Sequence, residues 1–190
     1  MADTTDDRSG WTLDERLRET PRDRAALERR VEALLAEIAT ARSQPAQLLG
    51  MLQSAAPLLL AAGRIDAAHR TASAAIAIAE LLEDVKGVFL NQLALAKALR
   101  WEGRFELATP LFDRLVAQAR SVPAFAPHLY DALFEAGANL FEQSRYREAA
   151  RFFREAQQLR RLEGAGADLD AVTYALRLTA ERSGEAPRTA

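Results

Sequence analysis

The sequence predicts an all-α protein built as a solenoid of helical hairpins. A pattern of seven residue positions occurs three times along the chain, at intervals of 40 and 41 residues. Within each copy, apolar residues recur three and four positions apart, which places them on one face of a helix. The chain is 49% hydrophobic, Ala and Leu dominate, and apolar and polar residues do not alternate over any useful length. Such a composition favours helices, and 190 residues suffice for one core.

The repeated pattern marks a turn between two helices and the faces that these helices pack together. The seven positions are Leu59, Leu99 and Leu140; Gly63, Gly103 and Ser144; Arg64, Arg104 and Arg145; Ile65, Phe105 and Tyr146; Ala68, Ala108 and Ala149; Ala72, Phe112 and Phe153; and Ala75, Leu115 and Ala156. Small residues in the middle of each first helix let the two helix axes approach closely. One hairpin cannot bury its own apolar face, so the three copies are predicted to stack.

These residues resemble the tetratricopeptide repeat (TPR) family. The shared features are a small residue in the first helix (Ala56, Ala96, Gly137), a glycine at the turn (Gly63, Gly103), an aromatic two positions later (Phe105, Tyr146), and an Ala and then an aromatic in the second helix (Ala108 and Phe112, Ala149 and Phe153). The resemblance covers about residues 46–162. It implies a right-handed superhelix with a concave binding face.

The sequence departs from the usual family pattern in three ways. The first repeat has Ile65 and Ala72 where aromatic residues are usual. The Trp that is common early in the first helix is replaced by Leu52, Gln92 and Leu133. The repeat also exceeds the usual period of about 34 residues. It is therefore similar to the longer-repeat branch, as in kinesin light chains and bacterial regulatory proteins.

The N-terminal region is predicted to precede the repeats as a flexible lead, residues 1–20. Within it, Thr12 and Glu15 have the spacing of a capping box and predict a short helix. A Thr-Pro pair followed by an apolar stripe predicts a capping helix over 21–42.

One domain, residues 21–183, is predicted to contain the three repeats and the two capping helices. Its repeats are expected at about 46–83, 85–121 and 128–162. Phe125, in the second inter-repeat loop, is expected on the surface of the stack. Asp168 is the predicted N-cap of a last capping helix over 168–183, before a disordered tail over 184–190.

Composition narrows the classes of function. The net charge of −2 suggests neither a nucleic-acid nor a membrane surface. The absence of cysteine excludes disulfides and Cys-ligated metals. No apolar run is long enough to span a membrane, and the acidic N-terminus lacks the apolar core of a signal peptide. A cytoplasmic protein is expected.

No enzymatic site is predicted. The two histidines, His69 and His128, have no carboxylate at metal-ligand spacing, so no metal or cofactor is expected. No serine lies in a nucleophile-elbow context. We therefore expect no catalytic residues.

The resemblance implies that the first helix of each hairpin lines a concave groove. Transferred by position, the candidate partner-binding residues are Gln53, Leu90, Leu93, Lys97, Arg100, Trp101, Asp131, Phe134, Phe141 and Glu142. In one interpretation, the aromatic residues anchor a peptide or helix of a partner protein, and charges facing each other across neighbouring repeats fix its direction. In the other, the apolar members are covered by the N-terminal helix or by the next repeat.

The predicted function is therefore a protein-protein interaction adaptor. The first alternative is a self-associating structural module, which would form a homo-oligomer. The others are a secretion-type chaperone and a nucleic-acid-binding repeat. The last would use the arginine stripe Arg147, Arg151, Arg154 and Arg161. A solvated outer face is the favoured interpretation of that stripe, since Glu148 and Glu155 lie within it.

Overall fold

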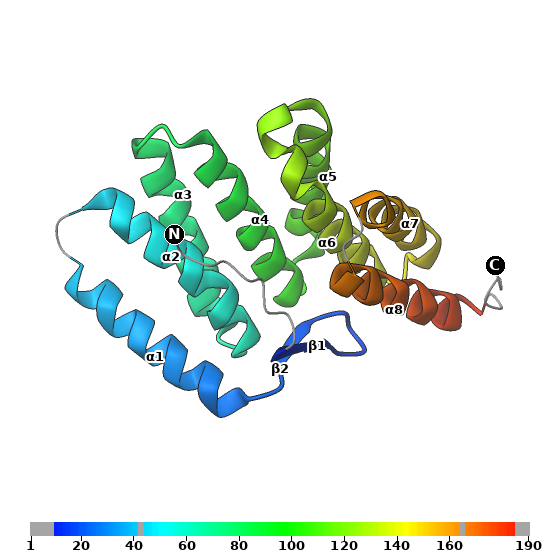
Figure 1. Ribbon diagram of the computed structural model, residues 1–190, viewed down its shortest axis with the longest axis horizontal. Coiled ribbons are helices and arrows are strands. Elements are labelled where there is room, and N and C mark those ends of the chain that lie inside the picture. The colour runs from blue at the N-terminus through cyan, green and yellow to red at the C-terminus, as the bar shows by residue number, and fades with distance from the viewer. Residues whose placement is uncertain (1–9, 42–43, 164–165, 185–190) are drawn as a thin grey trace.

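The computed structural model describes residues 10–41, 44–163 and 166–184. Within them a stack of antiparallel helices follows a short β-hairpin (Figure 1). The elements are β1 (Trp11–Leu13), β2 (Glu19–Pro21), α1 (Arg24–Thr40), α2 (Pro45–Ala61), α3 (Ile65–Leu81), α4 (Val85–Trp101), α5 (Phe105–Ser121), the 3₁₀ helix η2 (Pro123–His128), α6 (Leu129–Glu142), α7 (Tyr146–Glu163) and α8 (Gly166–Ser183). The predicted helical-repeat solenoid is confirmed, with α2–α3, α4–α5 and α6–α7 as its three hairpins.

The turn within each hairpin has the same geometry in all three repeats. Gly63, Gly103 and Ser144 adopt left-handed backbone conformations, with φ of 78°, 76° and 61°. The next residue, always an arginine, donates its main-chain N–H to the repeat leucine five positions earlier, at 2.8, 2.9 and 3.0 Å. These bonds satisfy carbonyls that the end of a helix leaves without a partner. The periodic residues of the sequence therefore form the helix-ending turns.

The small residues of the pattern lie where helices approach closely. Ala56 and Ala96 are buried in the first helices of their repeats. At Gly137, an added Cβ would lie 2.6 Å from the Phe153 ring of α7. The second-helix alanines of the pattern are buried as well.

The helices at the two ends begin at different residues from those predicted. Helix α1 packs on α2, but it starts at Arg24 and not at residue 21, because Asp23 caps it by accepting the N–H of Ala26 at 2.8 Å. Helix α8 packs on α7 and starts at Gly166, so Asp168 is not its N-cap. The tail beyond Gly184 lies outside the described residues.

The connection between the second and third repeats is more buried than predicted. Phe125 of η2 is only 5% exposed, because its ring stacks on Phe89 of α4 at 4.5 Å between centroids. The expectation of a surface position was wrong. Because η2 packs against α5, Phe125 joins the large buried cluster of the second and third repeats.

The predicted helix in the N-terminal lead is wrong, and the described part of the lead is a β-hairpin. Strands β1 and β2 are antiparallel, with Thr12 opposite Thr20. The two Thr hydroxyls lie 2.9 Å apart across the strands. Asp14 accepts the main-chain N–H groups of Arg16 and Arg18 at 2.8 and 2.9 Å, which bends the chain back on itself. This side-chain-to-backbone bonding replaces the capping box.

Among the described residues, the helices are all too short or too polar to cross a bilayer.

Candidate protein-interaction site

The first helices of the three repeats form one layer, here called the inner face. Helix α2 contacts α4, and α4 contacts α6. The N-terminal β-hairpin lies across the C-terminal ends of these helices, beside α8 (Figure 1). An extended segment of the chain thus occupies part of the face that was predicted to bind a partner.

The β-hairpin is attached to the inner face by alternating residues. The side chain of Trp11 packs on the apolar cluster of α1 and α2, and Leu13 packs on the larger cluster of the second and third repeats. Thr12, between them, is exposed. This alternation is that of a strand with one buried face.

Leu17, at the tip of the β-hairpin, is the most deeply inserted residue of the segment. It is 1% exposed and belongs to the same buried cluster as Phe134 and Phe141. Its φ of 58° is in the left-handed region, which is strained for leucine. Burial of the side chain offsets that strain. The strained residue marks the point where the hairpin is held.

Arg18 follows Leu17 and makes the specific polar contacts of the segment. Its Nε and Nη2 donate to the two carboxylate oxygens of Glu142 at 3.2 and 2.7 Å. Nη2 also donates to the main-chain oxygen of Trp101 at 3.3 Å. The guanidinium carbon lies 5.0 Å from the centroid of the Trp101 ring. A bidentate carboxylate contact, a carbonyl contact and a cation–π contact made by one side chain suit arginine better than lysine.

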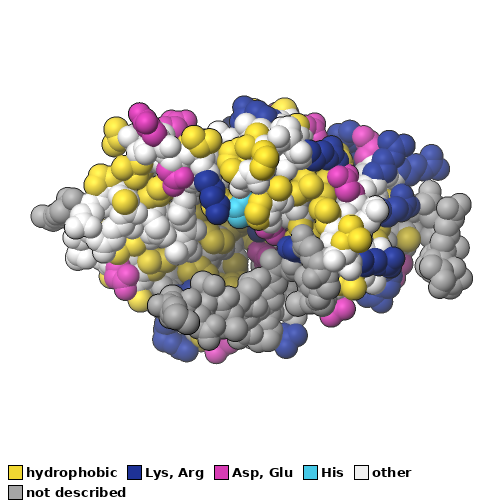
Figure 2. Space-filling view, turned by 45° about the horizontal axis from the view of Figure 1, so that its top comes forward, with side chains coloured by type: hydrophobic (Ala, Val, Ile, Leu, Met, Phe, Trp, Pro, Cys, Tyr) yellow, Lys and Arg dark blue, Asp and Glu magenta, His cyan; other side chains and the backbone are white. Residues whose placement is uncertain are grey.

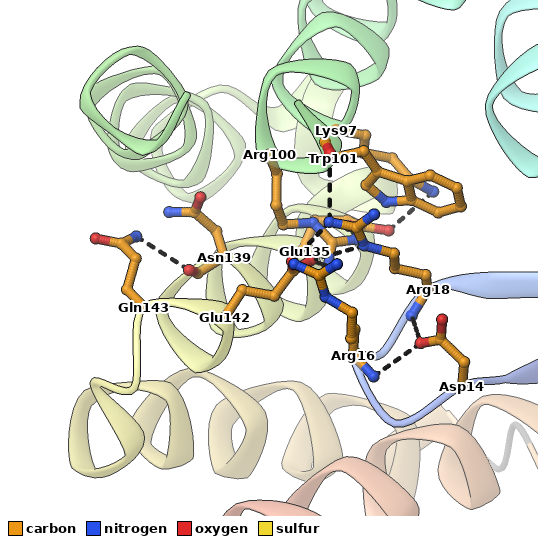
Figure 3. A network of polar contacts seen from close by, with 10 residues as sticks. All are labelled: Asp14, Arg16, Arg18, Lys97, Arg100, Trp101, Glu135, Asn139, Glu142 and Gln143. Carbon is orange, nitrogen blue, oxygen red and sulfur yellow. Dashed lines mark hydrogen bonds and ion pairs between the residues drawn. The ribbon is translucent and has the colours of Figure 1, made fainter. Parts of the chain in front are cut away.

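Beneath Arg18, an ion-pair network links α4 to α6 (Figure 3). Arg100 is 1% exposed and donates to Glu142 at 3.0 Å and to Glu135 at 2.9 Å. Lys97 lies 2.8 Å from Glu135 and 3.2 Å from Glu19 of β2. Arg16 joins from the hairpin loop, at 3.1 Å from Glu142. The network therefore includes residues from both repeats and from the hairpin.

The electrostatics of this network favour the charged form of Lys97. Burial by itself lowers the pKa of Lys97, but Glu135 and Glu19 outweigh it and hold that pKa above its usual value. A buried charge without a partner is costly. The carboxylates of the inner face and the cations that meet them therefore depend on one another.

Solved structures resemble the overall fold of the chain, although no protein-family model and no curated protein sequence matches it. Two structures of a Podosopora anserina kinesin light chain candidate with nearly identical TPR-like repeats, one of them carrying a substitution, are each 19% identical to it. Their TM-scores are 0.61 and 0.62, over 84% of this chain and 80% of theirs. BtubC (BKLC) of P. vanneervenii is 20% identical with a TM-score of 0.63, over 86% of this chain and 68% of its own. The chain has a TPR-like fold. At this level of identity, the likeness establishes the architecture alone.

The TPR-like fold brings four of the ten predicted groove residues together. Lys97, Arg100, Trp101 and Glu142 meet in the network beneath the hairpin. Arg100 pairs with Glu142 across neighbouring repeats, and Lys97 pairs with Glu135, which was not among the predicted residues.

The remaining predicted residues lie elsewhere on the first helices. Leu93, Phe134 and Phe141 are 8, 8 and 6% exposed. Phe134 packs on Phe153 at 5.6 Å, and Phe141 packs on Tyr146 at 5.4 Å, so helix α7 of the same repeat covers both rings. Half-buried positions are occupied by Gln53, Leu90 and Asp131.

Sequence reasoning missed Glu135, Leu17 and Arg18. Glu135 had a usable signal, because it is a lone acid in an apolar run of α6, seven residues before Glu142. Leu17 and Arg18 had no such signal, because they act only when the β-hairpin packs onto repeats that are far from it in the sequence.

The other candidate chemistry is sparse. Within the described residues, the acids and histidines do not form a group of three or more that could hold a metal. His69 Nδ1 lies 2.7 Å from Glu102, beside a shallow pocket of about 270 Å³.

The arginine stripe is exposed on α7, and basic side chains gather toward the end of the molecule that contains α7 and α8 (Figure 2). Glu148 and Glu155 form ion pairs beside it.

Proposed function

We propose that the protein is a non-enzymatic interaction scaffold that binds a segment of a partner protein on its inner face. The observation that supports this proposal is the β-hairpin itself. An extended piece of polypeptide is seated there by an inserted leucine, a bidentate arginine-carboxylate contact and a cation–π contact. Such contacts are typical of peptide recognition.

The proposal is tested by affinity capture with the full chain as bait. The informative variant is Trp101→Ala, since Trp101 lies at the inner face and is only partly buried. A matched control is Leu162→Ala, which removes a side chain that is 80% exposed on α7. We expect a protein that is retained by the wild type and the control and lost from Trp101→Ala, with helicity unchanged by circular dichroism.

Two other results would count against the proposal. Equal retention by all three baits would remove the inner face as the binding surface. Recovery of the bait chain alone would favour the self-associating structural module.

A further inference from the structure

We propose that the inner face contains an arginine-recognition site for a Leu-Arg sequence, filled in cis by Leu17 and Arg18 and in trans by a partner segment of the same chemistry. The inference rests on the proposed scaffold function and specifies the ligand. The site comprises Glu142, Trp101 and the buried cluster that receives Leu17.

The Glu142 carboxylate is buried, and it meets cations from both the inner face and the hairpin. Its side chain is only 2% exposed, and its Oε1 meets Arg100 of the inner face at 3.0 Å. Within the part of the chain that the structure describes, its Oε2 is contacted by Arg18 at 2.7 Å and by Arg16 at 3.1 Å, both from the hairpin. A buried carboxylate oxygen needs a donor. When the hairpin leaves, this oxygen loses both cations, and an arginine of a partner segment can take their place.

The second argument is that the site distinguishes arginine from lysine. Two donors of Arg18 meet the two oxygens of one carboxylate, a third contact reaches the Trp101 carbonyl, and the planar group lies over the indole ring. A lysine ammonium cannot make this set of contacts at once. Arg16, by contrast, is 57% exposed and adds a peripheral ion pair.

The third argument is that the occupant can exchange. Strands β1 and β2 have three residues each, and an isolated hairpin of two strands is marginally stable in water. Only Arg22 and Asp23 separate β2 from α1, so the hairpin can open about this joint while α1 stays on α2. Local opening of this kind costs less than global unfolding.

The test uses the full chain and a fluorescently labelled synthetic peptide of residues 10–22. Arg18→Ala weakens the cis occupant and leaves the site intact, whereas Arg24→Ala removes a 79% exposed arginine on α1 as the matched control. We expect the peptide to bind the Arg18→Ala chain at least about tenfold tighter than the wild type or the control. Replacing Arg18 of the peptide by Lys should weaken that binding by about tenfold or more.

The chain also contains its own reporter. Its two tryptophans, Trp11 and Trp101, both lie where the hairpin meets the helices. In a Trp11→Phe background, the emission of Trp101 should shift to the red in the Arg18→Ala chain and return when an unlabelled peptide that also carries Trp11→Phe is added. If Arg18→Ala does not fold, Arg18→Lys serves as the weakened chain.

Equal affinity of the peptide for all chains, no binding to a folded Arg18→Ala chain, or indifference to the Arg-to-Lys change in the peptide would each overturn the inference. A partner protein that is lost from Trp101→Ala, but binds the wild-type and Arg18→Ala chains equally, would keep the proposed function and reject the arginine site. The two failures are therefore distinguishable.

Discussion

At the residue scale, two glycines in the helical stack differ in whether the packing around them has room for a side chain. Gly137 and Gly50 lie inside helices of the same stack, yet their surroundings differ. The first faces the Phe153 ring at close range, and the second has no atom within 4 Å of an added Cβ. The same substitution should therefore have opposite effects at the two positions.

We expect Gly137→Ala to lower the free energy of unfolding by about 1–3 kcal/mol, since overpacking against Phe153 exceeds the gain in helix propensity. Gly50→Ala should raise it by up to about 1 kcal/mol. Urea unfolding followed by circular dichroism measures both changes. Stabilisation by Gly137→Ala would show that α6 and α7 can move apart without loss.

His128 gives a second residue-scale prediction, one that depends on pH. Burial lowers the pKa of His128, assisted by Lys86 and opposed by Asp131, from an ordinary value of 6.5. The unfolded chain therefore binds a proton more readily than the folded chain below about pH 6.5, and stability is lost as the pH falls through that value.

Replacement of His128 by Asn should remove part of this loss. The measurement is the difference between urea midpoints at pH 7.5 and pH 5, which should be smaller for the variant than for the wild type. Identical differences would mean that other groups determine the acid sensitivity.

At the scale of the element, the repeat turn allows a comparison within one molecule. Ser144 adopts the left-handed conformation that glycines adopt in the other two repeats. Only glycine takes this conformation without cost, which for other residues is about 1 kcal/mol. The third hairpin is thus closed by the least suitable of the three turn residues.

Ser144→Gly should accordingly stabilise the protein by about 1 kcal/mol, and Gly103→Ser should destabilise it by a similar amount. The two substitutions act as reciprocal controls in thermal or urea unfolding. Ser144→Gly also removes a contact from the Tyr146 hydroxyl, at 3.3 Å, which is exposed and contributes little. A loss of stability in Ser144→Gly would show that this contact outweighs the backbone strain.

At the scale of the whole molecule, the inner face joins the hairpin to repeats that are far from it in the sequence. Arg18 and Glu142 are 124 residues apart, yet they are joined by a hydrogen bond of 2.7 Å. The hairpin also covers apolar residues on both sides of α4. A single chain thus supplies its own cover for this part of the stack.

We therefore expect one chain per particle at micromolar concentration. Light scattering coupled to size exclusion measures this mass directly. A mass of two chains would favour the self-associating alternative. Repeating the measurement with Arg18→Ala would then show whether the hairpin takes part in that contact.

The helical repeats and their turns could be predicted from the order of the residues alone. The repeat signal is local, because each turn residue, arginine and alanine acts within one hairpin through backbone geometry and close packing. The resemblance to the TPR family also placed Lys97, Arg100, Trp101 and Glu142 among the candidate groove residues, by their positions in the first helices.

The β-hairpin that covers these residues became evident only from the folded arrangement of the chain. The β-hairpin has no strong local signal, because its capping-box pattern favoured a helix and its stability comes from contacts with α4 and α6. The burial of Phe125 likewise depends on a ring from another repeat. Local periodicity specifies the stack, whereas the occupancy of its inner face depends on contacts between segments far apart in the chain.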